Sequence, residues 1–231
     1  MNASMFESTV RPVGTAQQSS GRSLPAAAVW ALPAGALLIA LHWLFPVGPR
    51  TPEGIARQFT SPVPLFVGEY LLFLGGFVVL LFGVMALADY LAGPDARRWS
   101  RAAGILSVTA IAIFLPGIGI PTIAFPGLGD LFLSGHPQVG IAIDAFSRGH
   151  FGPYVPVELL VMLAMSIAGA MAMGIAGWRS RAIPRWSSIA YPIGFVLNMT
   201  DTPGIAWVGV ALLVVSGVFI ARRLNRAKAG L

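Results

Sequence analysis

Two glutamates stand near the starts of long apolar stretches, where a charged side chain is costly. Glu69 is the only charged residue from Leu65 to Ala88, and Glu158 holds a similar place in the stretch Val155–Gly177. A carboxyl group in an apolar pocket can stay protonated near neutral pH and act as a general acid. A glutamate in the first turn of a helix also complements the helix dipole. The sequence alone leaves both explanations open.

Other polar residues gather near the same ends of the apolar stretches. The predicted pocket residues are His42, Glu69, Tyr70, Glu158 and Asn198. The candidate catalytic acids are Glu69, Glu158 and Asp201. Asp201 also suits a turn that precedes a helix, because a proline follows two residues later.

Several kinds of chemistry are excluded or disfavoured by the residue types present. The chain has no cysteine and three histidines, and these histidines show no H-x-x-x-H or H-E-x-x-H spacing. We therefore expect no metal site. Neither a P-loop nor a Rossmann glycine pattern occurs, so no cofactor is predicted. The net charge of +6 is not concentrated in a basic stripe on a soluble segment, so no nucleic-acid partner is expected.

Composition places the chain in the membrane class. Of its 231 residues, 56% are hydrophobic and only 10% are charged, whereas about 25% are charged in an ordinary soluble domain. A membrane-spanning helix needs roughly 20 apolar residues. The fold class predicted is an all-α, polytopic membrane bundle with six transmembrane helices. The expected spans are about 26–45, 65–91, 102–121, 155–177, 184–199 and 203–221.

The last two spans come from one apolar run, Ile183–Ala221, which is interrupted by LNMTDTPG. A hairpin of two helices is the preferred interpretation. A single long helix with a break is the alternative, and a re-entrant fifth segment stays open.

The basic residues predict the orientation of the bundle. With six spans, 12 of the 15 arginines and lysines fall on one side of the membrane, in both tails and in the 2–3 and 4–5 connections. Positive charge favours the cytoplasmic side. Both termini are therefore predicted to be cytoplasmic.

The remaining segments complete the predicted organisation. Residues 1–24 are expected to be a disordered cytoplasmic tail, 25–223 the six-helix membrane domain and 224–231 a basic cytoplasmic tail. Thr122–Tyr154 is predicted to be a long outer loop. Within it, HPQVGIAIDAFSR suggests a short amphipathic helix, with an exposed coil as the alternative. Small residues on two spans, Gly76 and Gly83 on one and Ser166, Ala170 and Gly174 on the other, predict close helix packing.

The layout resembles uncharacterised small six-helix membrane proteins of actinobacteria. The resemblance rests on the basic turn RSRAIPRW (Arg179–Trp186), the short hairpin after it and the outer loop between the third and fourth helices. It implies an integral protein of the inner (cytoplasmic) membrane and assigns no activity.

Three functions from different classes follow. The first is a bundle whose outward-facing polar pocket binds a small apolar or lipid-like ligand, or a partner protein of unknown kind. The second is an enzyme similar to membrane-integral terpene cyclases, which use intramembrane acids. The chain departs from that family in having Gly68-Glu69-Tyr70 where a Trp-Glu pair is expected, and six helices where seven are expected. The third is a transporter subunit, although the helix centres hold few polar residues. Membrane lipid is the one partner that every alternative requires.

Overall fold

The computed structural model describes residues 26–42, 44, 51–60, 63–147, 154–200 and 202–228, and every regular element among them is a helix. In chain order, the elements are η1 (Ala26–Trp30), α1 (Ala31–His42), α2 (Pro52–Thr60), α3 (Val63–Tyr90), α4 (Arg97–Leu133), α5 (Val139–Ser147), α6 (Tyr154–Ser180), α7 (Arg185–Asn198) and α8 (Pro203–Lys228). The all-α fold class is therefore confirmed.

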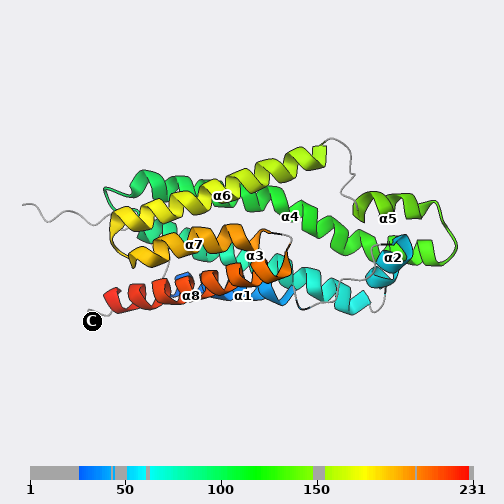
Figure 1. Ribbon diagram of the computed structural model, residues 1–231, viewed down its shortest axis with the longest axis horizontal. Coiled ribbons are helices and arrows are strands. Elements are labelled where there is room, and N and C mark those ends of the chain that lie inside the picture. Colours follow the sequence, from blue (N-terminus) through cyan, green and yellow to red (C-terminus); the bar gives the residue numbers. More distant parts are fainter. Residues whose placement is uncertain are drawn as a thin grey trace, which may run out of the picture.

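Long helices that run roughly side by side form the body of the molecule (Figure 1). Helix α1 contacts α3 and α8, α3 contacts α4, and α4 contacts α6. Helix α7 then packs between α6 and α8, so these helices close into a ring. Bundles of this kind bury apolar side chains in the centre of the ring.

Four described helical segments are long and apolar enough to cross a membrane. They are Val63–Tyr90, Arg97–Pro116, Leu159–Ser180 and Gly204–Ala227. Two shorter apolar segments are Ala28–Leu41 and Thr122–Leu133. Large apolar side chains such as Phe82 and Ile105 stay exposed on the surface of the bundle, as lipid contact requires.

Glycines allow the helices to approach closely, as the sequence predicted. A Cβ on Gly76 would lie 2.9 Å from the backbone nitrogen of Ile39, and a Cβ on Gly174 would lie 2.6 Å from the carbonyl oxygen of Ser188. The first contact joins α3 to α1 and the second joins α6 to α7. Without a side chain at these positions, the backbones can approach closely enough for dense van der Waals packing.

The hairpin predicted for the last two helices is confirmed, and the alternative of one long helix is wrong. Helix α7 ends at Asn198, and α8 begins at Pro203 and packs back against α7. A Cβ on Gly194 would lie 2.9 Å from the carbonyl oxygen of Gly209, so glycine is needed on both sides of this crossing.

The predicted outer loop is wrong in its first part. Helix α4 does not end near residue 121 but continues to Leu133, through Pro116, Pro121 and Pro126. Proline usually ends or kinks a helix, because it removes a hydrogen bond and crowds the preceding turn. Here α2 and α5 pack on the C-terminal part of α4, and this tertiary packing offsets the local cost.

Helix α2 lies in a segment for which no helix was predicted. Its start carries a recognisable signal, because Thr51 Oγ1 accepts a hydrogen bond from the backbone N–H of Gly54 at 3.1 Å and a proline and a glutamate follow Thr51. Glu53 also forms an ion pair with Arg57 one turn later, with an N–O distance of 2.8 Å. The Thr-Pro-Glu start and the Glu-to-Arg spacing of four residues are sequence signals that indicate this helix.

A second apolar cluster joins α2, α5 and the adjoining parts of α3 and α4. Phe59 stacks on Phe125 with ring centroids 4.6 Å apart. The other buried members are Ile55, Ala56, Phe66 and Ile143. The short helix predicted in the outer segment is thus confirmed as α5, with Ile143 on its buried face. In Figure 1, α2 and α5 lie together at one end of the long axis, at the far end of α4.

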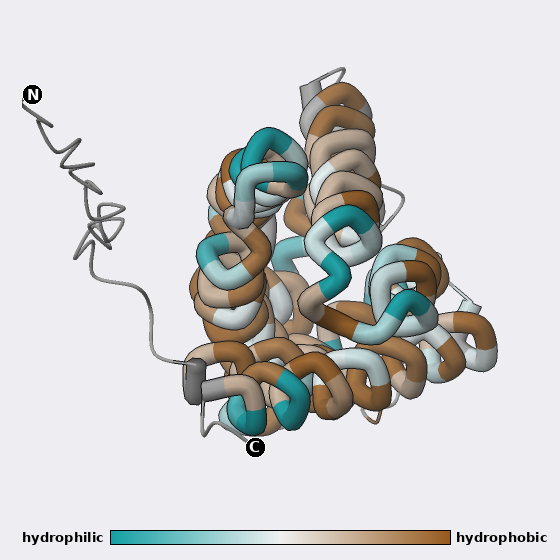
Figure 2. Tube along the Cα trace, turned by 90° about the vertical axis from the view of Figure 1, so that its left-hand side faces the viewer, coloured by the Kyte–Doolittle hydropathy of each residue, from teal (hydrophilic) through white to brown (hydrophobic). Residues whose placement is uncertain are grey.

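Among the described residues, the arginines predicted to share one side gather at the opposite end of the bundle, whereas Arg11 and Arg22 lie outside the described part of the chain. This end holds the α3–α4 turn, the α6–α7 turn and the last turns of α8 (Figure 2, hydrophilic segments in teal). Arg223 Nε donates a hydrogen bond of 3.0 Å to the carbonyl oxygen of Ala182, which ties α8 to the α6–α7 turn. Three segments far apart in sequence therefore present one basic surface.

Candidate functional site

An apolar cleft of about 320 Å³ opens between α1, α3, α4, α6 and α7. Its volume falls in the range of small-molecule pockets, which run from about 300 to 1,000 Å³. Its lining residues are Ile39, Phe73, Phe77, Phe114, Leu159, Met162, Leu163, Asn198, Met199 and Thr200. Nearly all of these are aliphatic, aromatic or thioether side chains, so the cleft suits an apolar molecule.

Three phenylalanines form one wall of the cleft. Phe73 and Phe77 are four residues apart on α3 and therefore share a face, and Phe114 meets them from α4. The ring centroids are 5.0 Å apart for Phe73 and Phe77, and 5.1 Å apart for Phe77 and Phe114. Both pairs are edge-to-face, an arrangement that aromatic rings favour and that holds the wall rigid.

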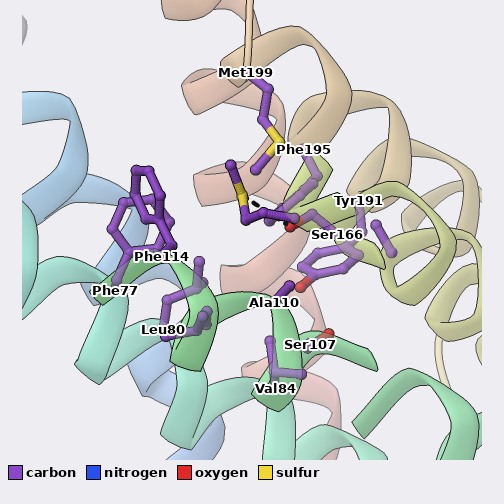
Figure 3. A pocket seen from close by; sticks show the side chains of 13 residues that line it. Phe77, Leu80, Val84, Ser107, Ala110, Phe114, Ser166, Tyr191, Phe195 and Met199 are labelled. Carbon is purple, nitrogen blue, oxygen red and sulfur yellow. Dashed lines mark hydrogen bonds between the residues drawn. The ribbon is translucent and has the colours of Figure 1, made fainter. Parts of the chain in front are cut away.

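A narrow inner cavity lined by α3, α4, α6 and α7 adjoins the cleft, and Figure 3 shows its lining side chains. It shares Phe77, Phe114, Met162 and Met199 with the cleft and has a volume of about 20 Å³, which is room for one water molecule. At its side, Ser166 Oγ donates to the sulfur of Met162 at 3.7 Å. The inner cavity therefore supplies little extra space, and a ligand would occupy the wider part.

Asn198 is the polar group that stands out in the cleft. Its Oδ1 atom is buried and has no hydrogen-bond partner among the described residues. Leaving a buried acceptor unbonded costs about 1–3 kcal/mol. Because Asn198 is the last residue of α7, the close α7–α8 crossing fixes its position at the cleft. Oδ1 therefore has unused hydrogen-bonding capacity at the edge of the cleft.

The other residues predicted for the pocket are described to different extents. Glu69 is buried, with 8% of its surface exposed, and takes part in a hydrogen-bonding or electrostatic interaction. Tyr70 packs against Phe66, with ring centroids 4.7 Å apart. The backbones of His42 and Glu158 lie in α1 and α6, but their side chains fall outside the described part of the structure, as does all of Asp201.

Because the Glu158 side chain is not described, the shared pocket of two carboxylates stays a prediction. Helical register nevertheless places the predicted residues close to the cleft. Glu69 precedes the lining residue Phe73 by four positions, and Glu158 precedes Met162 by four. One helical turn separates the members of each pair.

The lining residues that shape the cleft, above all Phe73, Phe114 and Met162, were not among the residues predicted for the pocket. Apolar residues occur on every face of these helices, so nothing in the pattern separates a cleft wall from a lipid-facing or core position. No group of three or more His, Asp or Glu side chains among the described residues is placed to hold a metal ion.

The described residues form an all-helical fold with four helices that can span a membrane and an apolar cleft lined by α1, α3, α4, α6 and α7. Comparison of the chain with known protein families, with curated proteins and with solved structures gives no match.

Proposed function

We propose that the protein is a multi-pass protein of the inner (cytoplasmic) membrane that binds a small apolar or lipid-like molecule in the cleft between α1, α3, α4, α6 and α7. The observation that carries this proposal is the unbonded, buried Oδ1 of Asn198 beside an otherwise apolar wall. Ligand pockets commonly combine an apolar lining with a few polar groups that fix orientation.

The chemistry of the cleft narrows the class of ligand. An amide oxygen accepts a hydrogen bond and cannot donate one, so the ligand should carry a hydroxyl or an N–H group. The phenylalanine wall suits an unsaturated or branched hydrocarbon body. An isoprenoid alcohol meets both conditions.

This ligand class can be tested with geraniol and its methyl ether, which has a similar shape but no donor. The wild-type protein should bind the alcohol about fivefold more tightly, because one hydrogen bond contributes about 1 kcal/mol. In Asn198→Leu the two ligands should bind about equally tightly, because leucine has a similar volume but accepts no hydrogen bond. Binding is measured by ligand-induced quenching of tryptophan fluorescence in detergent micelles.

The matched control is Asn225→Leu, which changes the same residue type on α8, away from the cleft. It should keep the wild-type preference. Equal binding of alcohol and ether by the wild-type protein would contradict the proposed ligand class. Asn198→Leu should also raise the thermal stability of the unliganded protein, since the unbonded acceptor is gone.

We further propose six spans with both termini in the cytoplasm. The ring of α1, α3, α4, α6, α7 and α8 supports this arrangement, because its turns alternate between the two ends of the bundle. The gathering of hydrophilic, arginine-bearing turns at one end supports a cytoplasmic position for that end.

Because the chain has no cysteine, single-cysteine variants can report its topology. We expect a membrane-impermeant maleimide to label Gln138→Cys, in the exposed α4–α5 turn, on intact cells. Ser8→Cys and Ala227→Cys should react only after lysis. Labelling of Ala227→Cys on intact cells would show that the proposed orientation is wrong. If only one of Ser8→Cys and Ala227→Cys is labelled on intact cells, the termini lie on opposite sides and six spans are excluded.

A further inference from the structure

A basic cleft of about 430 Å³ lies at the arginine-rich end of the bundle, away from the apolar cleft described above. Its cationic lining residues are Arg97, Arg98 and Arg101 from the start of α4 and Arg179 from the end of α6. The acidic residue in its lining is Asp95. Four guanidinium groups against one carboxylate leave the cleft strongly positive.

The charges in this cleft are not neutralised within the described part of the chain. None of the four arginines forms an ion pair with a described carboxylate. Two of them instead flank one indole ring: the guanidinium carbons of Arg98 and Arg179 lie 5.4 Å and 5.9 Å from the ring centroid of Trp99. Cation–π contacts of this kind hold like charges near each other without removing their charge.

A groove between α3 and α4 continues from the basic cleft. It has a volume of about 960 Å³ and shares Arg97 and Arg101 with the cleft. Met85, Ile105 and Val108 line it and are exposed at its surface. Ser100 closes its floor by donating a hydrogen bond to the carbonyl oxygen of Ala88, so α3 and α4 stay joined beneath the groove.

Cleft and groove together are basic at one end and mainly apolar along α3 and α4. Asp89 and Thr109 are further polar residues in the groove lining, and with Asp95 counted the four arginines still outnumber the two acids. Guanidinium groups bind phosphate oxygens in pairs of hydrogen bonds. Basic pockets between membrane helices on the cytoplasmic side suit anionic lipid headgroups.

We propose that this surface is a binding site for one anionic phospholipid, with its phosphate in the basic cleft and an acyl chain in the α3–α4 groove. The site rests on the membrane location proposed above, but it is independent of the ligand in the apolar cleft. Loss of geraniol binding and loss of phospholipid binding are separate measurements, so either proposal can fail without the other.

The headgroup half is tested by lipid retention on the purified, full-length protein, measured by native mass spectrometry. The wild type should retain phosphatidylglycerol at least about tenfold better than phosphatidylcholine. Arg97→Gln/Arg101→Gln should lose most of this preference. The control Arg222→Gln/Arg226→Gln removes the same charge from exposed residues at the same end, outside the cleft, and should keep it.

The acyl-chain half is tested by filling the groove. A Cβ on Gly104 would lie 3.6 Å from the Cβ of Ala88, an ordinary contact, so Gly104→Leu should fold and occupy the groove. It should lower phosphatidylglycerol retention about fourfold through lost apolar contact. Gly75→Leu, at a position of α3 with open space around it, should have no effect.

Three results would overturn the assignment. Equal losses in the two double-arginine variants would mean that only surface charge matters. Equal retention of phosphatidylglycerol and phosphatidylcholine would show that the site does not select an anionic headgroup. Binding of inorganic phosphate as tightly as phosphatidylglycerol would show that this is a site for a soluble anion. For a lipid site, we expect inorganic phosphate to bind weakly, and equally weakly to the wild type and to Gly104→Leu.

Discussion

Gly209→Ala is expected to lower the free energy of unfolding by about 2–3 kcal/mol, although alanine is the better helix former by about 1 kcal/mol. A Cβ at this position would meet the backbone nitrogen of Asn198 and lie 2.7 Å from the carbonyl oxygen of Gly194. Both contacts are with backbone atoms, which cannot rotate away as a side chain can. Helices α7 and α8 must therefore separate to accept one methyl group.

The measurement is unfolding in mixed micelles, followed by circular dichroism as the denaturing detergent is increased. Gly204→Ala is the matched control on the same helix, because a Cβ there meets nothing within 4 Å. It should leave stability unchanged or raise it slightly. If both variants shift the transition equally, the close α7–α8 crossing does not limit stability.

The same substitution should also affect the apolar cleft. Because the crossing sets the position of Asn198 at the end of α7, separating the helices displaces Oδ1 from the cleft. Gly209→Ala should thus lose the preference for geraniol over its methyl ether, while Gly204→Ala keeps it.

Phe125→Ala is expected to destabilise the packing of α2 and α5 by about 3 kcal/mol. The free energy of unfolding of the rest of the bundle should not change. Phe125 is 6% exposed, stacks on Phe59 and belongs to the apolar cluster that joins α2 and α5 to α3 and α4. The buried residues of this cluster are distinct from those of the main core of the ring, although Tyr70 packs against both. Removing the ring should therefore detach α2 and α5 while the bundle stays folded.

Hydrogen exchange distinguishes local from global unfolding. Amides of α2 and α5 should exchange faster in Phe125→Ala, whereas those of α1 and α3 at the main core should not change. Ile123→Ala is the control, since this neighbouring side chain is 84% exposed. Faster exchange throughout the bundle would show that the two clusters unfold as one unit.

Much of the membrane architecture could be predicted because its causes are local. The apolar run of α3 is long enough to span a bilayer whatever it packs against, and the arginines of the helix turns mark one end of the bundle. The α7–α8 hairpin was also predictable, since LNMTDTPG carries residues that interrupt a helix.

The errors came from segments in which tertiary contacts oppose local propensity. The third helix was predicted to end near Pro121, but packing of α2 and α5 keeps α4 helical to Leu133. Helix α2 was missed although Thr51 and Pro52 give a starting signal, because its nine residues are too few to stand out as a membrane span.

The sequence by itself thus determined an all-helical protein with helices apolar enough to span a membrane, and a polar amide in the last turn before α8. Only the tertiary structure decided that Asn198 Oδ1 is buried beside Phe73 and Phe114, and that arginines from α4 and α6 share one cleft. The physical reason is that hydropathy follows the transfer of each residue into lipid, which is a local property. A cleft depends instead on which faces of separate helices meet, and that is set by close contacts such as those at Gly76, Gly174 and Gly209.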